Sequence, residues 1–172
     1  MMSSERQKPD IPVLFLLDEF AALGHLTIAK TAFTLGRGYG AKMCPILQNL
    51  DQLKGLYEKE YRTFLSNAGV TLFWSVNDLS TAEEVSRMMG KYTQMTASRG
   101  MSESTQGGSV NYGENMTARD FATPDEVITL DKRMVVAFIA NYRPLELWRI
   151  SYYDDPRFYG LVDPNPYEPR GI

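Results

Sequence analysis

The sequence has a single cysteine, Cys44, and a single histidine, His25. An internal disulfide, a cysteine zinc cluster and a metal site built from several histidines are therefore excluded for this chain. Long apolar runs are also lacking, because the longest, residues 11–17, falls well short of the roughly 20 residues that span a bilayer. We therefore expect no membrane segment in this chain, and we expect it to be soluble and cytoplasmic.

An excess of basic charge is missing as well. The chain carries 18 Lys and Arg against 21 Asp and Glu, which gives a formal charge of −3. A nucleic-acid partner would therefore need local positive charge or charge from another chain. With 172 residues, 44% of them hydrophobic and 23% charged, the composition is that of one ordinary soluble domain or part of a larger one.

Apolar strand-like segments alternate with amphipathic helix-like segments along the chain. We predict strands at 11–17, 42–47, 70–76, 133–140 and 145–153, and helices at 20–37, 53–68, 80–89 and 123–130. The continuous apolar run at 11–17 is typical of a strand buried on both faces of a parallel sheet. The order of elements predicts an α/β sandwich with a mostly parallel sheet. The short connection 141–144 predicts a C-terminal antiparallel hairpin.

Three segments fall outside this pattern. Residues 1–10 are polar and are expected to form a loose leader. Residues 93–118 are rich in Ser, Thr, Gly, Gln and Asn, which predicts a mobile loop or an exposed hairpin inserted in the domain. Residues 159–172 form a proline-rich tail, which is expected to be extended. The folded domain is therefore expected over residues 11–158.

Polar residues follow three predicted strands, and ligands in parallel sheets bind at such carboxyl ends. An apolar strand followed by Asp18 and Glu19 is the Walker B arrangement of nucleotide hydrolases. In that arrangement the Asp holds Mg²⁺, usually through water, and the Glu polarises the attacking water. A strand that simply ends in two acids is the alternative, and this short motif alone leaves both open.

Two further residues are candidates for the same chemistry. Gln48 ends the next predicted strand, where it could reach a γ-phosphate or the attacking water. Arg37 lies between two glycines and is a candidate arginine finger, because a guanidinium stabilises transferring phosphoryl charge. Taken singly, a loop glutamine and an exposed surface arginine are the simpler interpretations.

Four separated blocks resemble TraG-type coupling proteins of type IV secretion and conjugation. They are residues 13–26 (VLFLLDEFAALGHL), 36–53, 63–90 and 143–158 (RPLELWRISYYDDPRF), and they occur in the family's order. The resemblance implies membrane-anchored, RecA-like hexameric ATPases that deliver DNA or protein to a secretion channel. It implies that Asp18 and Glu19 are the Walker B pair, with Asp18 at the metal. Gln48 then matches the sensor residue, and Arg37 matches the arginine that acts on a neighbouring subunit's nucleotide.

The sequence departs from that family in having no Walker A motif, G-x-x-x-x-G-K-[ST]. The resemblance therefore implies the C-terminal part of the ATPase domain, a partial RecA-like P-loop NTPase sandwich. The absent P-loop strand would lie between strands 42–47 and 70–76 and would leave a gap with unpaired edges. We expect ATP and Mg²⁺ to bind only in the complete domain, and the chain to be inactive alone.

The resemblance implies a segment that couples ATP hydrolysis to substrate delivery at the cytoplasmic face of the bacterial inner membrane. The implied partners are other coupling-protein subunits, secretion and relaxosome components, and DNA through the complete assembly. A non-catalytic, truncated interaction module of the same machinery is the alternative. A Mg²⁺-dependent nuclease ranks last, because two-metal cleavage usually needs more carboxylates than Asp18 and Glu19 offer.

Overall fold

The computed structural model describes residues 9–102 and 109–161. The first part of the chain forms a parallel strand pair with a helical crossover. In order it contains β1 (Val13–Leu17), the 3-10 helix η1 (Phe20–Leu23), α1 (Thr27–Leu35), η2 (Gly36–Tyr39) and β2 (Ala41–Pro45). β1 and β2 pair in parallel along their whole length. Their carboxyl ends therefore lie side by side, which is where the sequence predicts the site.

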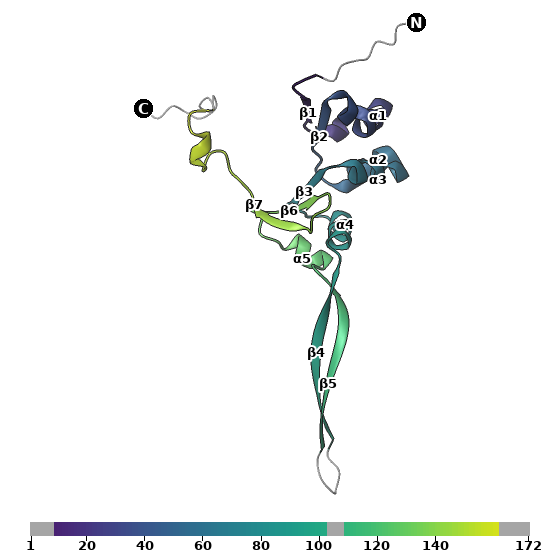
Figure 1. Cartoon of the computed structure of the whole chain (residues 1–172), viewed down its shortest axis with the longest axis vertical. Helices are drawn as coiled ribbons and strands as arrows, with labels where there is room; N and C mark the ends of the chain where they lie inside the picture. The colour runs from purple at the N-terminus through teal and green to yellow at the C-terminus, as the bar shows by residue number, and fades with distance from the viewer. Residues whose placement is uncertain (1–8, 103–108, 162–172) are drawn as a thin grey trace.

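The second part of the chain forms an antiparallel sheet and a long hairpin. It contains α2 (Leu50–Tyr57), η3 (Glu58–Glu60), α3 (Tyr61–Asn67), β3 (Val70–Trp74), α4 (Leu79–Met89), β4 (Lys91–Ser102), β5 (Ser109–Asp120), α5 (Pro124–Ile128), β6 (Met134–Ile139), β7 (Leu145–Trp148) and η4 (Pro156–Phe158). β6 lies between β3 and β7 and is antiparallel to both. Among the described strands, β4 and β5 pair only with each other, and they extend from the body as a two-stranded arm (Figure 1).

The α/β class and the C-terminal antiparallel hairpin are confirmed by these elements. Among the described strands, parallel pairing is confined to β1 and β2, because the returning hairpin β6–β7 attaches antiparallel to β3. β2 and β3 belong to different sheets, as expected for a domain that lacks a strand between them. Of residues 93–118, left open as a loop or a hairpin, the described parts 93–102 and 109–118 belong to β4 and β5, and 103–108 lie outside the described residues.

Two hydrophobic clusters hold the body together. One joins η1, α1, α2 and α3 through the buried residues Phe20, Ala29, Leu53, Tyr57 and Phe64. The other packs α4 and α5 against the antiparallel sheet; its buried members are Leu50, Phe73, Ala82, Val85, Met89, Ala122, Val127 and Val136. Helix α2 contributes to both clusters, and it therefore connects the two parts of the body.

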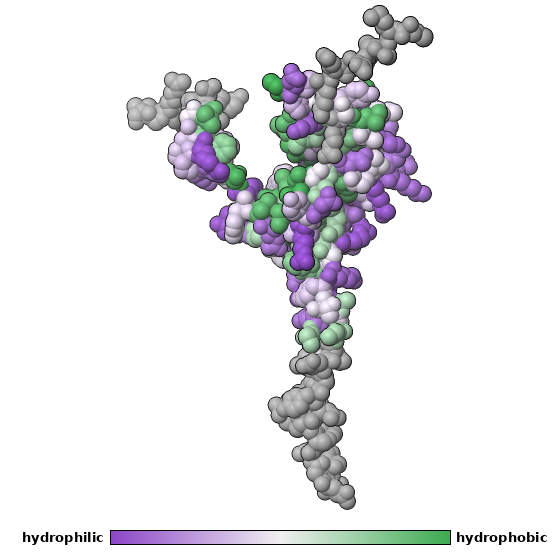
Figure 2. Space-filling view, in the orientation of Figure 1, coloured by the Kyte–Doolittle hydropathy of each residue, from purple (hydrophilic) through white to green (hydrophobic). Residues whose placement is uncertain are grey.

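The predicted burial of β1 on both faces is wrong. Leu14 and Leu16 are 62% and 63% exposed, and Val13 and Phe15 on the other face are 50% and 46% exposed. Within the described residues, β2 pairs with one edge of β1, but neither face of the strand is well covered. Figure 2 accordingly shows hydrophobic residues on the surface of the body above the β4–β5 arm, the part that contains β1–β2 and the antiparallel sheet.

Helix boundaries also depart from the sequence predictions. The single helix expected at 20–37 is divided by Gly24, which adopts a φ of 69°. The helix expected at 53–68 begins earlier, at Leu50, and is interrupted at Glu58. The run Ser80-Thr81-Ala82-Glu83 matches a capping-box pattern, which predicts Ser80 as the N-cap of this helix. That prediction is wrong, because Asp78 is the N-cap of α4 and accepts from the Thr81 N–H. No helix among the described residues has both the length and the apolar character to cross a membrane.

Candidate functional site

Glu19 stands where β1 turns away from the sheet. The Ile46 N–H donates to the Leu17 carbonyl at 2.9 Å, and the Phe20 N–H donates to the Ile46 carbonyl at 3.0 Å. Between these bonds Glu19 adopts a φ of 47° and a ψ of 46°. These angles fall in the left-handed region, which residues other than glycine rarely occupy. The fully buried Phe20 ring, which packs on Tyr57 and Phe64, holds this turn in place. Core packing thus stabilises a strained backbone at the predicted general base.

Gln48 lies in a short loop that is tied down on both sides. Asn49 is the N-cap of α2 and accepts from the Gln52 N–H at 3.0 Å. The Gln52 side chain accepts from the Gln48 N–H at 3.1 Å. The buried Leu50 N–H donates to the Thr81 hydroxyl of α4 at 3.1 Å. The loop after β2 is therefore held by its own helix start and by α4.

An open pocket brings the two strand ends together. Its lining consists of Glu19, Ala21, Ala22, Gln48 and Gln52. Two of the predicted site residues, Glu19 and Gln48, therefore share one pocket at the carboxyl ends of β1 and β2. A carboxylate base and a polar sensor that act on one water or phosphate would have to share a pocket in this way.

Asp18 is exposed beside this pocket, and its Oδ1 accepts from the Glu19 N–H at 3.0 Å. In the part of the chain that the structure describes, no group of three acidic, histidine or cysteine side chains comes together as a metal site. Asp18 is thus a single hard oxygen ligand. A Mg²⁺ ion bound there would take its other ligands from water and from phosphate, as Mg²⁺ often does.

Arg37 is not brought to this pocket by the backbone. It lies in η2, which leads into the amino end of β2. Glu19 and Gln48 follow the carboxyl ends of the strand pair, so the five-residue strand separates the two places by ~16 Å. Any action of Arg37 on a nucleotide in this pocket would need a different copy of the chain, which stays a prediction.

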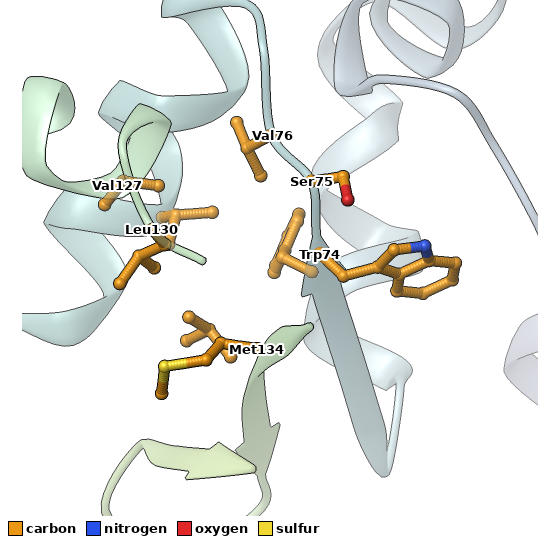
Figure 3. A pocket seen from close by; sticks show the side chains of 9 residues that line it. Trp74, Ser75, Val76, Val127, Leu130 and Met134 are labelled. Carbon is orange, nitrogen blue, oxygen red and sulfur yellow. The ribbon is translucent and has the colours of Figure 1, made fainter. Parts of the chain in front are cut away.

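A second, apolar cavity lies on the antiparallel sheet. Figure 3 shows Val76, Val127, Leu130 and Met134 around it, with the Trp74 indole turned away. Ser75 is the one polar residue of its lining. With no carboxylate or cation in that lining, the cavity is an imperfection of core packing and carries no catalytic arrangement.

A polar bridge joins α2 to α4 next to the site. Ser80 donates to Asp51 at 2.6 Å and receives a bond from Lys54 at 2.5 Å. Lys54 also lies 3.2 Å from the Asp51 carboxylate. The Ser80 hydroxyl, followed by the Lys54 ammonium, holds the pKa of Asp51 below its usual range. The bridge ties α2, which begins just after Gln48, to the first turn of α4.

A family model described as type IV secretory system conjugative DNA transfer matches residues 1–166. The chain belongs to this conjugative DNA-transfer family. It is 34% identical to the protein VirD4 of Rhizobium rhizogenes over 148 residues, which cover 83% of the chain and 21% of that relative. It is 29% identical to the conjugal transfer protein TraG of Rhizobium radiobacter over 159 residues, which cover 91% of the chain and 25% of TraG.

Solved structures support the fold of this family member. The unbound conjugative coupling protein TrwB matches with a TM-score of 0.65 at 21% identity, over 86% of the chain and 33% of TrwB. TrwB in complex with ADP and Mg²⁺ matches with a TM-score of 0.61 at 20% identity, over 81% of the chain and 31% of TrwB. The chain therefore spans between a fifth and a third of the relatives it matches.

Sequence reasoning missed Gln52 and Thr81 at this site. The signal for Gln52 was available, because asparagine followed three residues later by glutamine is a helix-start pattern. No local signal pointed to Thr81, which lies 31 positions from its partner Leu50. Only the packing of α4 against α2 makes that contact.

Proposed function

We propose that this family member supplies the Walker B part of an ATPase domain in a coupling protein. The observation that carries the proposal is the shared pocket of Glu19 and Gln48 at the ends of two parallel strands. In this pocket Glu19 accepts a proton from the attacking water, and Gln48 orients that water or the γ-phosphate. Both roles need the fixed backbone that Phe20 and Gln52 provide.

ATP and Mg²⁺ fit the donors at this end of the sheet. Asp18 offers an exposed carboxylate that makes no ion pair within the described residues, and it would hold Mg²⁺. The metal, when bound, neutralises charge that develops on the phosphate oxygens. The solved structure of TrwB in complex with ADP and Mg²⁺ supports nucleotide binding in the family.

We infer that the rest of the domain covers β1 and places a strand between β2 and β3. The apolar faces of β1 and of the antiparallel sheet are exposed, and exposed apolar patches mark surfaces against which other protein packs. The sequence has no Walker A motif, so the phosphate-binding loop and its lysine come from that other part. The chain alone is therefore expected not to hydrolyse ATP.

The proposed setting is a hexameric assembly at the cytoplasmic face of the inner membrane. Its partners would be secretion and relaxosome components, with DNA bound by the complete assembly. The net charge of −3 supports a role for other parts of the assembly in contacting the phosphate backbone. A non-catalytic interaction module is the alternative, and the missing Walker A motif is the observation on which that alternative rests.

Transfer of plasmid DNA from donor cells tests the proposal. Glu19→Gln in the complete coupling protein removes the general base while keeping side-chain size, and transfer should fall by at least 100-fold. Glu83→Gln, on the exposed side of α4, is the matched control and should transfer normally. Normal transfer by Glu19→Gln at wild-type protein levels would favour the non-catalytic module.

A further inference from the structure

The oxygen and the nitrogen of the Gln52 side-chain amide have different hydrogen-bonding roles. Its Oε1 accepts from the Gln48 N–H at 3.1 Å, and a backbone N–H can only donate. The carbonyl end of the amide must therefore face Gln48. The same side chain lines the pocket with Glu19 and Gln48, so the donor end, Nε2, is left for the pocket.

Gln52 is itself held in place by the start of α2. Its backbone N–H donates to Asn49 Oδ1 at 3.0 Å, and Asn49 is the N-cap. In the usual capping box, the side chain at this third helical position reaches back to the N-cap N–H. Here it reaches one residue further, to Gln48. The bond therefore exceeds what helix capping needs and restrains the residue that follows the strand end.

We propose that Gln52 is the positioning residue for Gln48. Its Oε1 holds the Gln48 backbone at the rim of the pocket, and the Gln48 side chain is thereby directed to the same space as Glu19. The buried Leu50–Thr81 bond restrains the other side of this loop. This inference rests on the proposed ATPase function, which supplies the reaction in which Gln48 acts.

Two variants separate the acceptor from the size of the side chain. Gln52→Met keeps the length and loses the acceptor, whereas Gln52→Glu keeps an oxygen that accepts from Gln48. Gln94→Met in the arm is the matched control, since Gln94 is exposed and remote in the sequence. The first measurement is amide exchange at Gln48 by NMR on the 172-residue chain without nucleotide. A lost bond worth ~1 kcal/mol predicts about fivefold faster exchange in Gln52→Met and unchanged exchange in the other two.

The second measurement is ATP turnover by the complete coupling protein. Gln52→Met should lower kcat at least tenfold with KM within twofold, because a misplaced sensor affects the transition state more than ATP binding. Unchanged Gln48 exchange, or faster exchange with unchanged kcat, would overturn the inference. Absence of turnover in the wild-type complete protein would instead overturn the proposed function. The two failures are distinguishable, because exchange is measured without ATP.

Discussion

At the scale of single residues, the backbone of Glu19 opposes the preference of its own side chain. A left-handed conformation costs a residue with a Cβ roughly 1–2 kcal/mol, and glycine avoids this cost. Glu19→Gly should therefore be ~1 kcal/mol more stable than Glu19→Ala in urea unfolding of the chain, although both lose the carboxylate.

Glu83 provides the opposite control in the same experiment. It lies inside α4, where glycine is ~1 kcal/mol worse than alanine. Glu83→Gly should therefore be less stable than Glu83→Ala. If both positions favour alanine, Glu19 is not held in the left-handed region.

Asp131 is paired with an arginine two residues along the chain. The Arg133 guanidinium bonds to it at 2.7 Å and 3.1 Å, and these bonds, with the Arg133 N–H, lower the pKa of Asp131 to about 2. The stability from this lowered pKa is present above pH ~4 and is lost as the pH falls towards 2. Arg133→Met should raise the pKa of Asp131 towards its ordinary value of 3.8, as measured by NMR titration. A pKa that stays near 2 would assign the effect to backbone N–H groups alone.

The sequence indicated which residues belong to the candidate site, but it did not indicate the backbone conformation or packing around them. Asp18, Glu19 and Gln48 could be selected because each follows an apolar strand. The left-handed turn at Glu19 could not, because it depends on Phe20 reaching a core built from Tyr57 and Phe64, far along the chain.

At the scale of elements, the junction between α2 and α4 connects the two parts of the body. Thr81→Val keeps the shape of the side chain but leaves the buried Leu50 N–H without its acceptor. An unsatisfied buried donor costs about 1–3 kcal/mol, so the urea midpoint should fall accordingly. Thr93→Val, on an exposed strand position, should change the unfolding free energy by less than ~0.5 kcal/mol. Equal stability of the two variants would contradict the role of this bond.

Whether a segment is a helix or a strand was predictable wherever its pattern of apolar residues was clear. The strands beginning near residues 11, 42, 70, 133 and 145, and the end of α4 at Met89 just before Gly90, follow the sequence pattern. The ends of the elements were less predictable. At the start of α4, Asp78 accepts from the Thr81 N–H, whereas the Ser80 hydroxyl donates to Asp51 of α2 instead of capping the helix. Tertiary contacts thus decided which of two possible caps is used.

At the scale of the whole molecule, apolar side chains on β1 and β3 are left exposed to solvent. Leu14, Leu16 and Leu72 are each close to half exposed or more, at 62%, 63% and 48%. The average sedimentation coefficient of the chain should therefore rise with concentration. Changing these three leucines to threonine should move it towards the monomer value. A wild-type chain that stays a monodisperse monomer at every concentration would contradict the proposed gap.

The most direct test of the account is Mg²⁺-dependent ATP turnover by the complete coupling protein carrying Glu19→Gln. With the base removed and Asp18, Gln48 and the phosphate-binding loop intact, we predict that turnover falls at least 100-fold. ATP binding should remain within a few-fold of wild type. Turnover at the wild-type rate would contradict the assignment of Glu19, and with it the ATPase function proposed for this pocket.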